Sequence, residues 1–413
     1  MKLTLLFICM VKLVSASTTS GLDTIKELTQ INIDYLDARL QTINSQEDKE
    51  IAIYQYFPTI SLFASTFESA ASFGFATDQI KSQGITARWT VFNFFQDLYK
   101  YHAAKNTLKS NESFQRAMLL AAEKSSFEVY LNYLNNYEQY MIKKDITETL
   151  DQSAKVAKGK FKRGETSGSE SNKIIIQSLN TKNESETFLA NSEFYKERIL
   201  KLLKKKSLKP TWPLSESNIK SKVSQLLKAK ASFEQNPNIE KFRFDKKAME
   251  DLVTSQKLRH LGEVNLNYRN QKSNLDGFND WDTQITLTYT FPIFANNTIQ
   301  ADVVKTKNKL KLAQTKLEQE KAKLRALKKS QKIKIRISFE NFKRQLQASK
   351  LANTVYQQEL RKFKRGLVSV NDLLFEQQRQ SQAQLGLITS KNDLLLSLVD
   401  FCHLQGKEFK TCL

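Results

Sequence analysis

The sequence predicts a mainly helical protein with a small β-sheet component, built as a tandem duplication of one unit. Three observations support this prediction. Short motifs recur at a constant spacing, two spans of about 65 residues lack helix-breaking residues, and four short stretches alternate between apolar and polar residues. Each copy is therefore expected to contain a pair of strands and one long antiparallel helical hairpin.

Four repeated motifs indicate the duplication. Residues 105–109 match 307–311, 137–140 match 339–342, 161–164 match 363–366, and Phe92 matches Phe294. The interval is the same for every pair, since 307 minus 105 and 294 minus 92 are both 202. An insertion between the motifs would break this spacing, so chance explains it poorly. The mature chain is expected to divide into a first repeat (17–206), a connecting, equatorial helical segment (207–250), a second repeat (251–406) and a C-terminal tail (407–413).

Two long spans are predicted to be helical. Gln96–Lys160 and Thr298–Lys362 contain no proline, and their only glycine is Gly159, near the end of the first span. As a single helix, each span would be about 97 Å long. In the second span apolar residues recur every seven positions: Val303, Leu310, Leu317 and Leu324. This period is typical of a coiled coil, so the core is expected to be a seam between helices.

The same short motif ends both spans and turns the chain back. A glycine is followed by a serine three residues later and by an acidic residue six residues later. These residues are Gly164, Ser167 and Glu170 in the first copy, and Gly366, Ser369 and Asp372 in the second. Glycine suits the left-handed position beyond a helix end, and a serine with an acid three residues on resembles a capping box. Return helices are expected at about Glu170–Lys206 and Asp372–Gln405.

Four stretches before the long helices alternate with a period of two. The clearest is Thr283–Phe291, and weaker or shorter ones lie near 264–269, 85–91 and 56–66. Loops are expected near Glu68–Lys81 and Gln271–Asp280. A small soluble sheet with one buried face fits this alternation. However, strands of about 9–11 residues with aromatic ends favour a transmembrane sheet. The residues expected to face lipid are Ile285, Leu287, Tyr289 and Phe291.

Four transmembrane strands cannot close a barrel, since known barrels begin at about eight strands. Several chains must therefore share one barrel. Two chains would give eight strands and an interior filled by side chains, while three would give twelve strands and an open lumen.

The N-terminal residues 1–16 have the features of a cleaved signal peptide: Lys2, an apolar run from Leu3 to Val14, and small residues at the cleavage point. No later segment is apolar for long enough to predict a transmembrane helix. Cys402 and Cys412 would be free to pair in an oxidising compartment, and two unpaired thiols fit the sequence equally well.

Charge and motif content argue against other classes of function. The formal net charge is +21, but the lysines and arginines are spread along predicted helix faces, so no nucleic-acid partner is expected. His102, His260 and His403 are scattered, and the sequence contains no metal-type Cys/His cluster and no glycine-rich phosphate loop. We therefore predict no enzyme activity and no catalytic, cofactor-binding or metal site.

Three further motifs carry a resemblance to a known family. Phe291-Pro292-Ile293-Phe294 follows the last alternating stretch, Asn236-Pro237 opens the second copy, and residues 365–374 (RGLVSVNDLL) form the second turn. In this order, from about Leu22 to Gly406, the sequence resembles the TolC-like outer-membrane efflux proteins, or outer membrane factors.

The resemblance implies a homotrimer in which a twelve-stranded outer-membrane β-barrel continues into a twelve-helix periplasmic tunnel, or α-barrel. Such a protein is a passive export duct in the outer membrane and periplasm. It serves a tripartite efflux or type I secretion system with a periplasmic membrane-fusion adaptor and an inner-membrane pump. The alternative is a soluble periplasmic coiled-coil scaffold whose short sheets only join helices.

The resemblance also assigns roles to the two turns. They would form the periplasmic tips that contact the adaptor, through Gly164, Ser167, Gly366, Leu367, Val368 and Ser369. Glu170 and Asp372 would be candidates for a constricted aperture, although each is equally expected to cap its return helix. The first turn is more polar than the second, so its adaptor contact would be altered. If arginine and lysine line the lumen, the preference for cations that an acidic entrance suggests would be lost.

Overall fold

The structure is a computed structural model that describes residues 21–69, 78–214, 216–228, 235–273, 281–293 and 297–412. The predicted signal peptide, residues 1–16, and Phe294 lie outside these residues. The chain forms two compact units, which are described separately. The helical unit takes in Met1–Asn32, Leu119–Ala231 and Lys328–Leu413, and the sheet unit takes in Ile33–Met118 and Ser232–Leu327.

The long helices and their return helices repeat along the chain. Helix α3 (Gln96–Lys162) and helix α7 (Thr298–Lys364) begin and end at positions separated by the same interval as the repeated motifs. The starts of the return helices α4 (Gly168–Leu203) and α8 (Val370–Leu404) keep this interval too. The predicted fold class of duplicated helical hairpins is therefore confirmed. The observed helix ends lie within about three residues of the predicted ones, the usual uncertainty of boundaries predicted from sequence.

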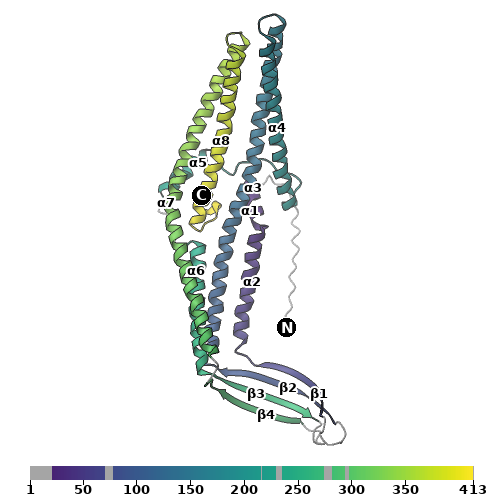
Figure 1. The fold of residues 1–413 in the computed structure, drawn as a ribbon, viewed down its shortest axis with the longest axis vertical. Helices are drawn as coiled ribbons and strands as arrows, with labels where there is room; N and C mark the ends of the chain where they lie inside the picture. Colours follow the sequence, from purple (N-terminus) through teal and green to yellow (C-terminus); the bar gives the residue numbers. More distant parts are fainter. Residues whose placement is uncertain are drawn as a thin grey trace. The chain divides into compact units, whose positions relative to one another are not determined.

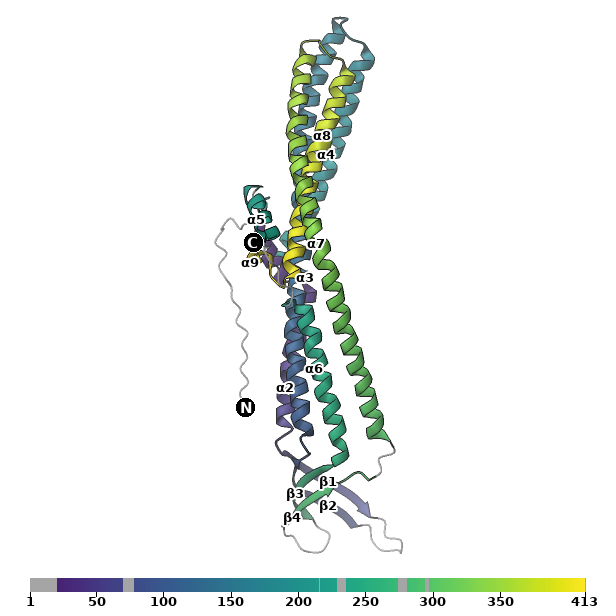
Figure 2. The same ribbon diagram turned by 90° about the vertical axis from the view of Figure 1, so that its left-hand side faces the viewer.

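In the helical unit, the ends of the two hairpins pack against each other (Figure 2). Buried apolar residues from all four helices form one cluster: Ile146, Leu150, Ala154, Ala157, Ile174, Tyr356, Leu360, Phe363, Val370 and Leu373. Polar contacts also join α4 to α8, where the Lys173 ammonium donates to Asn371 Oδ1 at 3.1 Å. The same unit contains α1 (Gly21–Gln30), α5 (Glu216–Lys228) and α9 (Phe409–Cys412). Cys402 is disulfide-bonded, and the side chain of Cys412 lies outside the described part of the chain.

In the sheet unit, α2 (Ile33–Tyr54) and α6 (Pro237–Leu258) lie alongside the first part of α3 (Figure 1). Small residues of α2 allow its close approach to α3: Ala38, Ser45 and Ala52 are buried and lie seven residues apart. Asn111 donates to the Ser45 hydroxyl at 3.0 Å across this contact. Helix α6 begins where the side chain of Asn236 accepts from Asn238 N, with proline at the first helical position. A short 3₁₀ turn, η1 (Arg259–Leu261), then leads into the sheet.

The sheet has four antiparallel strands in the order β1-β2-β3-β4, which confirms the predicted number. The strands are β1 (Thr59–Ser69), β2 (Asp78–Phe92), β3 (Glu263–Ser273) and β4 (Trp281–Thr290). Both predicted loops were too long, because Ser69 pairs with Asp78 and Gln271 pairs with Asp282, although the predicted end of the second loop at Asp280 agrees with the start of β4. Continued pairing satisfies backbone groups there that a longer loop would leave to solvent.

Among the described residues, no helix combines the length and the apolar character that a bilayer-spanning helix needs.

Candidate functional sites on the sheet faces and the hairpin turns

The two faces of the sheet differ sharply in chemistry. Residues that pair directly across strands point to the same side, so the register assigns each residue to a face. On one side, the apolar face, Trp89 pairs with Leu266 and Leu266 pairs with Leu287. The apolar face carries Ile60, Leu62, Ile85, Trp89, Val264, Leu266, Tyr268, Ile285, Leu287 and Tyr289. The polar face carries Ser61, Thr86, Arg88, Thr90, Asn265, Asn267, Arg269, Gln284, Thr286 and Thr288.

The apolar face is open. Leu62 is 81 % exposed, Ile60 70 % and Leu287 67 %, so no described part of this chain covers them. A small soluble sheet would bury one face against its own chain. This sheet buries neither, and its apolar side therefore needs an apolar environment from outside the chain.

Aromatic residues gather where the strands meet the helices. The ring centroids of Phe92 and Phe94 are 4.9 Å apart, those of Phe94 and Tyr289 6.3 Å, and those of Tyr289 and Phe291 6.4 Å. Phe291 lies one residue beyond β4, and the regular alternation of β2 ends in a register shift between Thr90 and Phe92. Of the four residues predicted to face lipid, three therefore lie on one side of β4, and Phe291 continues the row at its end.

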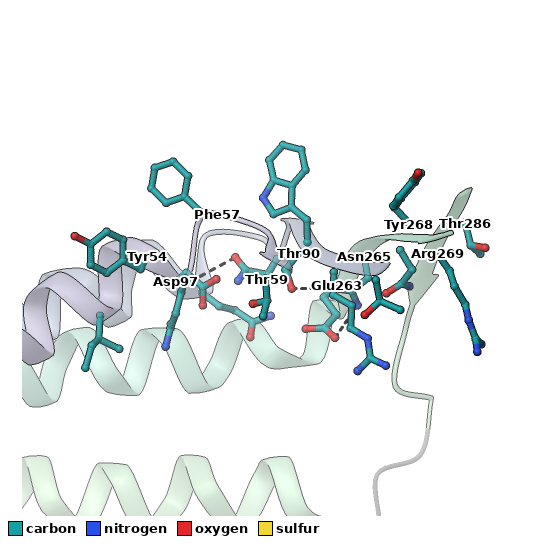
Figure 3. Close-up of a pocket in the computed structure, with 18 of the residues that line it drawn as sticks. Tyr54, Phe57, Thr59, Thr90, Asp97, Glu263, Asn265, Tyr268, Arg269 and Thr286 are labelled. Atoms are coloured by element: carbon teal, nitrogen blue, oxygen red, sulfur yellow. Dashed lines mark hydrogen bonds between the residues drawn. The ribbon is translucent and has the colours of Figure 1, made fainter. Parts of the chain in front are cut away.

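A hollow of about 1180 Å³ lies at the polar face, and Figure 3 shows most of the side chains that line it. Tyr268 and Arg269 point to opposite sides of the sheet in this view, as the register requires. Within the hollow, Thr90 donates to Asn265 Oδ1 at 2.8 Å, and Asn265 Nδ2 donates to Glu263 Oε1 at 2.9 Å. Hydroxyl, amide and charged groups of this kind suit a surface that water wets.

Both edges of the sheet are open. Strand β1 has 11 residues and strand β4 has 10, and within the described residues no strand pairs with the outer side of either. Edges of this length expose rows of backbone N–H and C=O groups, which pair readily with strands of another chain.

The predicted hairpin turns have the expected geometry. Gly164 and Gly366 have φ values of +78° and +82°, which suit glycine best. Gly366 N donates to Phe363 O and Leu367 N donates to Lys362 O, both at 3.0 Å. This pair of bonds is the Schellman arrangement that satisfies the last carbonyls of a helix. The first turn repeats it, since Glu165 N donates to Lys160 O at 2.9 Å.

The acidic residues of the two turns differ in how they contact the starts of the return helices. Asp372 N donates to the Ser369 hydroxyl at 3.2 Å, and Ser369 N donates to Asp372 Oδ2 at the same distance, which completes a capping box. Glu170 N donates to the Ser167 hydroxyl at 3.2 Å, and the Glu170 carboxylate accepts a hydrogen bond from Thr166. The capping interpretation therefore has direct geometric support for Asp372, whereas in the first turn Ser167 supplies the cap and the Glu170 carboxylate binds the Thr166 hydroxyl instead. An aperture role for either acid stays a prediction.

We expect Ser369→Ala to weaken the first turn of α8 by about 1 kcal/mol, because an N-cap bond is lost. Amide hydrogen exchange in that turn should accelerate roughly fivefold. Asp372→Ala should have the same effect on exchange and, unlike Ser369→Ala, also removes a charge. Unchanged exchange in Ser369→Ala would contradict the cap.

The remaining predicted tip residues differ in accessibility. Leu367 is 69 % exposed, while Val368 is partly buried against the apolar cluster of the helical unit. Sequence reasoning missed Lys160, which joins the ends of α3 and α7. Its ammonium donates to Phe363 O at 2.7 Å and lies 4.8 Å from the centre of the Phe363 ring. Lys160 is one of many lysines on a helix, so no sequence signal distinguished it.

No protein-family model and no curated protein sequence matches this chain. Solved structures do match it over nearly its whole length. The Campylobacter jejuni CmeC outer membrane channel aligns with a TM-score of 0.81 at 16 % identity, covering 97 % of this chain and 90 % of that one. The open state of the Neisseria gonorrhoeae MtrE outer membrane channel aligns with a TM-score of 0.76 at 12 % identity, covering 95 % and 94 %.

A third match is the outer membrane protein VceC from Vibrio cholerae, with a TM-score of 0.72 at 13 % identity, covering 94 % of this chain and 96 % of that one. The chain therefore has the fold of these outer membrane channels. This agreement bears out, at the level of the fold, the resemblance to TolC-like proteins that the sequence motifs carry.

Proposed function

We propose that this chain is the subunit of an outer-membrane efflux channel, a passive duct that crosses the outer membrane and extends into the periplasm. One observation carries the proposal: a four-stranded sheet exposes an apolar face to its surroundings and a polar face to the other side. Lipid on the first side and water on the second satisfy both faces together. Strand lengths of 10 and 11 residues in β4 and β3 match the span of a tilted transmembrane strand.

Self-association follows from the open edges of β1 and β4. Because four strands cannot close a barrel, copies of the chain supply the missing neighbours. A homotrimer gives twelve strands and a lumen that side chains do not fill, as a duct requires.

Helix α2 supports association between copies independently of the sheet. Its outward side carries a row of exposed apolar residues at coiled-coil spacing: Ile33, Leu36, Leu40 and Ile43. Ile33 is 80 % exposed and Leu40 is 59 % exposed, so no described part of the chain covers this row. A neighbouring copy would bury it.

The duct moves solutes only when another machine supplies the energy. We propose a periplasmic adaptor and an inner-membrane pump of a tripartite efflux or type I secretion system as its partners. The hairpin turns are the proposed docking point, since Leu367 presents an exposed apolar side chain there. The second candidate function is a soluble periplasmic scaffold. In a scaffold of this kind, the exposed apolar face of the sheet would contact water instead of an apolar partner.

Cell fractionation tests the proposal. We expect the protein in the outer-membrane fraction, extractable only by detergent, as a species of three chains that dissociates to one chain on heating. The fraction and the mass would be measured by immunoblotting and by light scattering corrected for detergent. Release of the protein by osmotic shock as a single chain would support the scaffold and exclude the channel.

A further inference from the structure

The polar face of the sheet carries two arginines at mid-strand, Arg88 in β2 and Arg269 in β3. Both side chains are exposed, and neither forms an ion pair with any residue that the structure describes. Arg88 pairs with Asn267, and Arg269 lies two residues further along the same strand. Such diagonal neighbours are roughly 7 Å apart between Cβ atoms. Two positive charges without an ion-pair partner among the described residues therefore lie side by side on the wetted face.

Arg269 is held in a defined position. Its guanidinium carbon lies 5.0 Å from the centre of the Phe63 ring on β1, a cation–π contact that reaches across β2. Gly84 lies between them on β2, because it pairs with Phe63 on one side and with Gln271 on the other. The glycine has no side chain to block this contact. The stacked guanidinium keeps its charge and its hydrogen-bond donors, since an aromatic ring does not neutralise it.

The acidic groups of this face lie away from Arg88. Glu263 is four residues along β3 from Asn267, a backbone separation of about 13 Å, and its carboxylate accepts from Asn265 Nδ2. Asp97 is paired with Lys100 at 2.9 Å. Asp282 lies diagonal to Arg269 but forms no ion pair among the described residues. The residues that pair with Arg88, Thr59 and Asn267, carry a hydroxyl and an amide, and near the middle of the face the two arginines outnumber the one acid, Asp282.

We infer that Arg88 and Arg269 form a cationic band in the sheet portion of the duct and make it selective for anions and anionic solutes. This inference rests on the proposed function, in which the polar face lines the lumen. Three copies would place six guanidinium groups around the same stretch of the passage, an arrangement that favours anions in a pore. The formal net charge of +21 acts in the same direction, by attracting anions to the protein.

Reversal potentials of the purified, full-length protein in planar lipid bilayers under a KCl gradient test the inference. We expect the wild-type channel to pass chloride in preference to potassium. The double variant Arg88→Gln/Arg269→Gln should lower the chloride-to-potassium permeability ratio at least about twofold. Arg88→Lys/Arg269→Lys should keep the ratio because it keeps the charge. Lys272→Gln, three residues along β3 from Arg269 and on the opposite face, should leave it unchanged.

The outcomes separate the two proposals. A conducting channel whose permeability ratio is the same in wild type and in the double glutamine variant overturns the anion band and leaves the channel intact. The absence of any conductance in the wild type overturns the channel and the band together. If the double variant does not assemble, Arg88→Gln alone provides the test, because the exposed Arg88 side chain forms no ion pair among the described residues whose loss would disturb packing. An unchanged ratio in that variant also contradicts the inference.

Discussion

Leu287→Arg is expected to abolish assembly of the protein in the outer membrane. Leu287 lies at the centre of β4, is 67 % exposed, and pairs with Leu266 on the apolar face. If that face meets hydrocarbon, an arginine there costs about 2–4 kcal/mol in each copy. The cost is repeated in every subunit, so an assembled trimer would carry roughly 6–12 kcal/mol of destabilisation, comparable to the whole stability of a folded protein.

The neighbouring residue offers a matched control. Thr286 precedes Leu287 in the same strand and points to the polar face, where it lines the hollow. Thr286→Arg adds the same charge and bulk on the wetted side, so we expect normal amounts of heat-dissociable trimer. The measurement is the amount of trimer in detergent extracts of the outer membrane. Equal assembly of both variants would show that the apolar face does not meet lipid.

Much of this architecture could be predicted from the sequence because its signals are periodic. A seven-residue period placed Val303, Leu317 and Leu324 in a helix seam, and all three are buried. A two-residue period placed Ile285, Leu287 and Tyr289 on one side of a strand. The constant interval between the repeated motifs predicted that the second hairpin would repeat the first, and the helix ends follow it.

Features that depend on contacts between distant segments were beyond this reasoning. Lys160 donates a hydrogen bond to the carbonyl of Phe363, which belongs to the other repeat of the same chain. Nothing in the local sequence distinguishes Lys160 from the other lysines. The alternation of β2 and β3 placed Arg88 and Arg269 on polar sides, but only the strand register brings them next to each other. The strand ends extend into the predicted loops for the same reason, since pairing partners and not local composition decide where the strands stop.

If the turns dock on an adaptor as proposed, Leu367→Asp is expected to reduce export roughly tenfold or more while the channel still assembles. Leu367 is 69 % exposed at the second turn, and it contributes less to the apolar cluster of the helical unit than Val368 does. If the adaptor buries this side chain, the contact gains about 1.5–3 kcal/mol from the leucine, and an aspartate in its place would bring an unpaired charge into the contact. The measurements are site-specific cross-linking to the adaptor and the minimum inhibitory concentration of a transported toxic compound.

Gly366→Trp would also disturb the proposed adaptor contact, but it changes the backbone of the turn at the same time. Gly366 has a φ of +82°, which strains any other residue, and an added Cβ would lie 3.6 Å from the Lys160 ammonium. A loss of export in that variant would combine a lost contact with a distorted turn. Leu367→Met keeps both the backbone and the apolar character, so we expect near-normal export from it.

The first turn supplies a second control and shows why the effect should be unequal between the two tips. Glu165 directly follows Gly164, as Leu367 directly follows Gly366, and its carboxylate accepts from Arg163 Nε at 2.6 Å. This bond holds the pKa of the Glu165 carboxyl below its ordinary value, so the residue stays charged and hydrated. A hydrated ion pair contributes little to an apolar docking contact. Glu165→Ala should therefore leave export nearly unchanged, and a loss as large as that of Leu367→Asp would mean that both tips bind the adaptor equally.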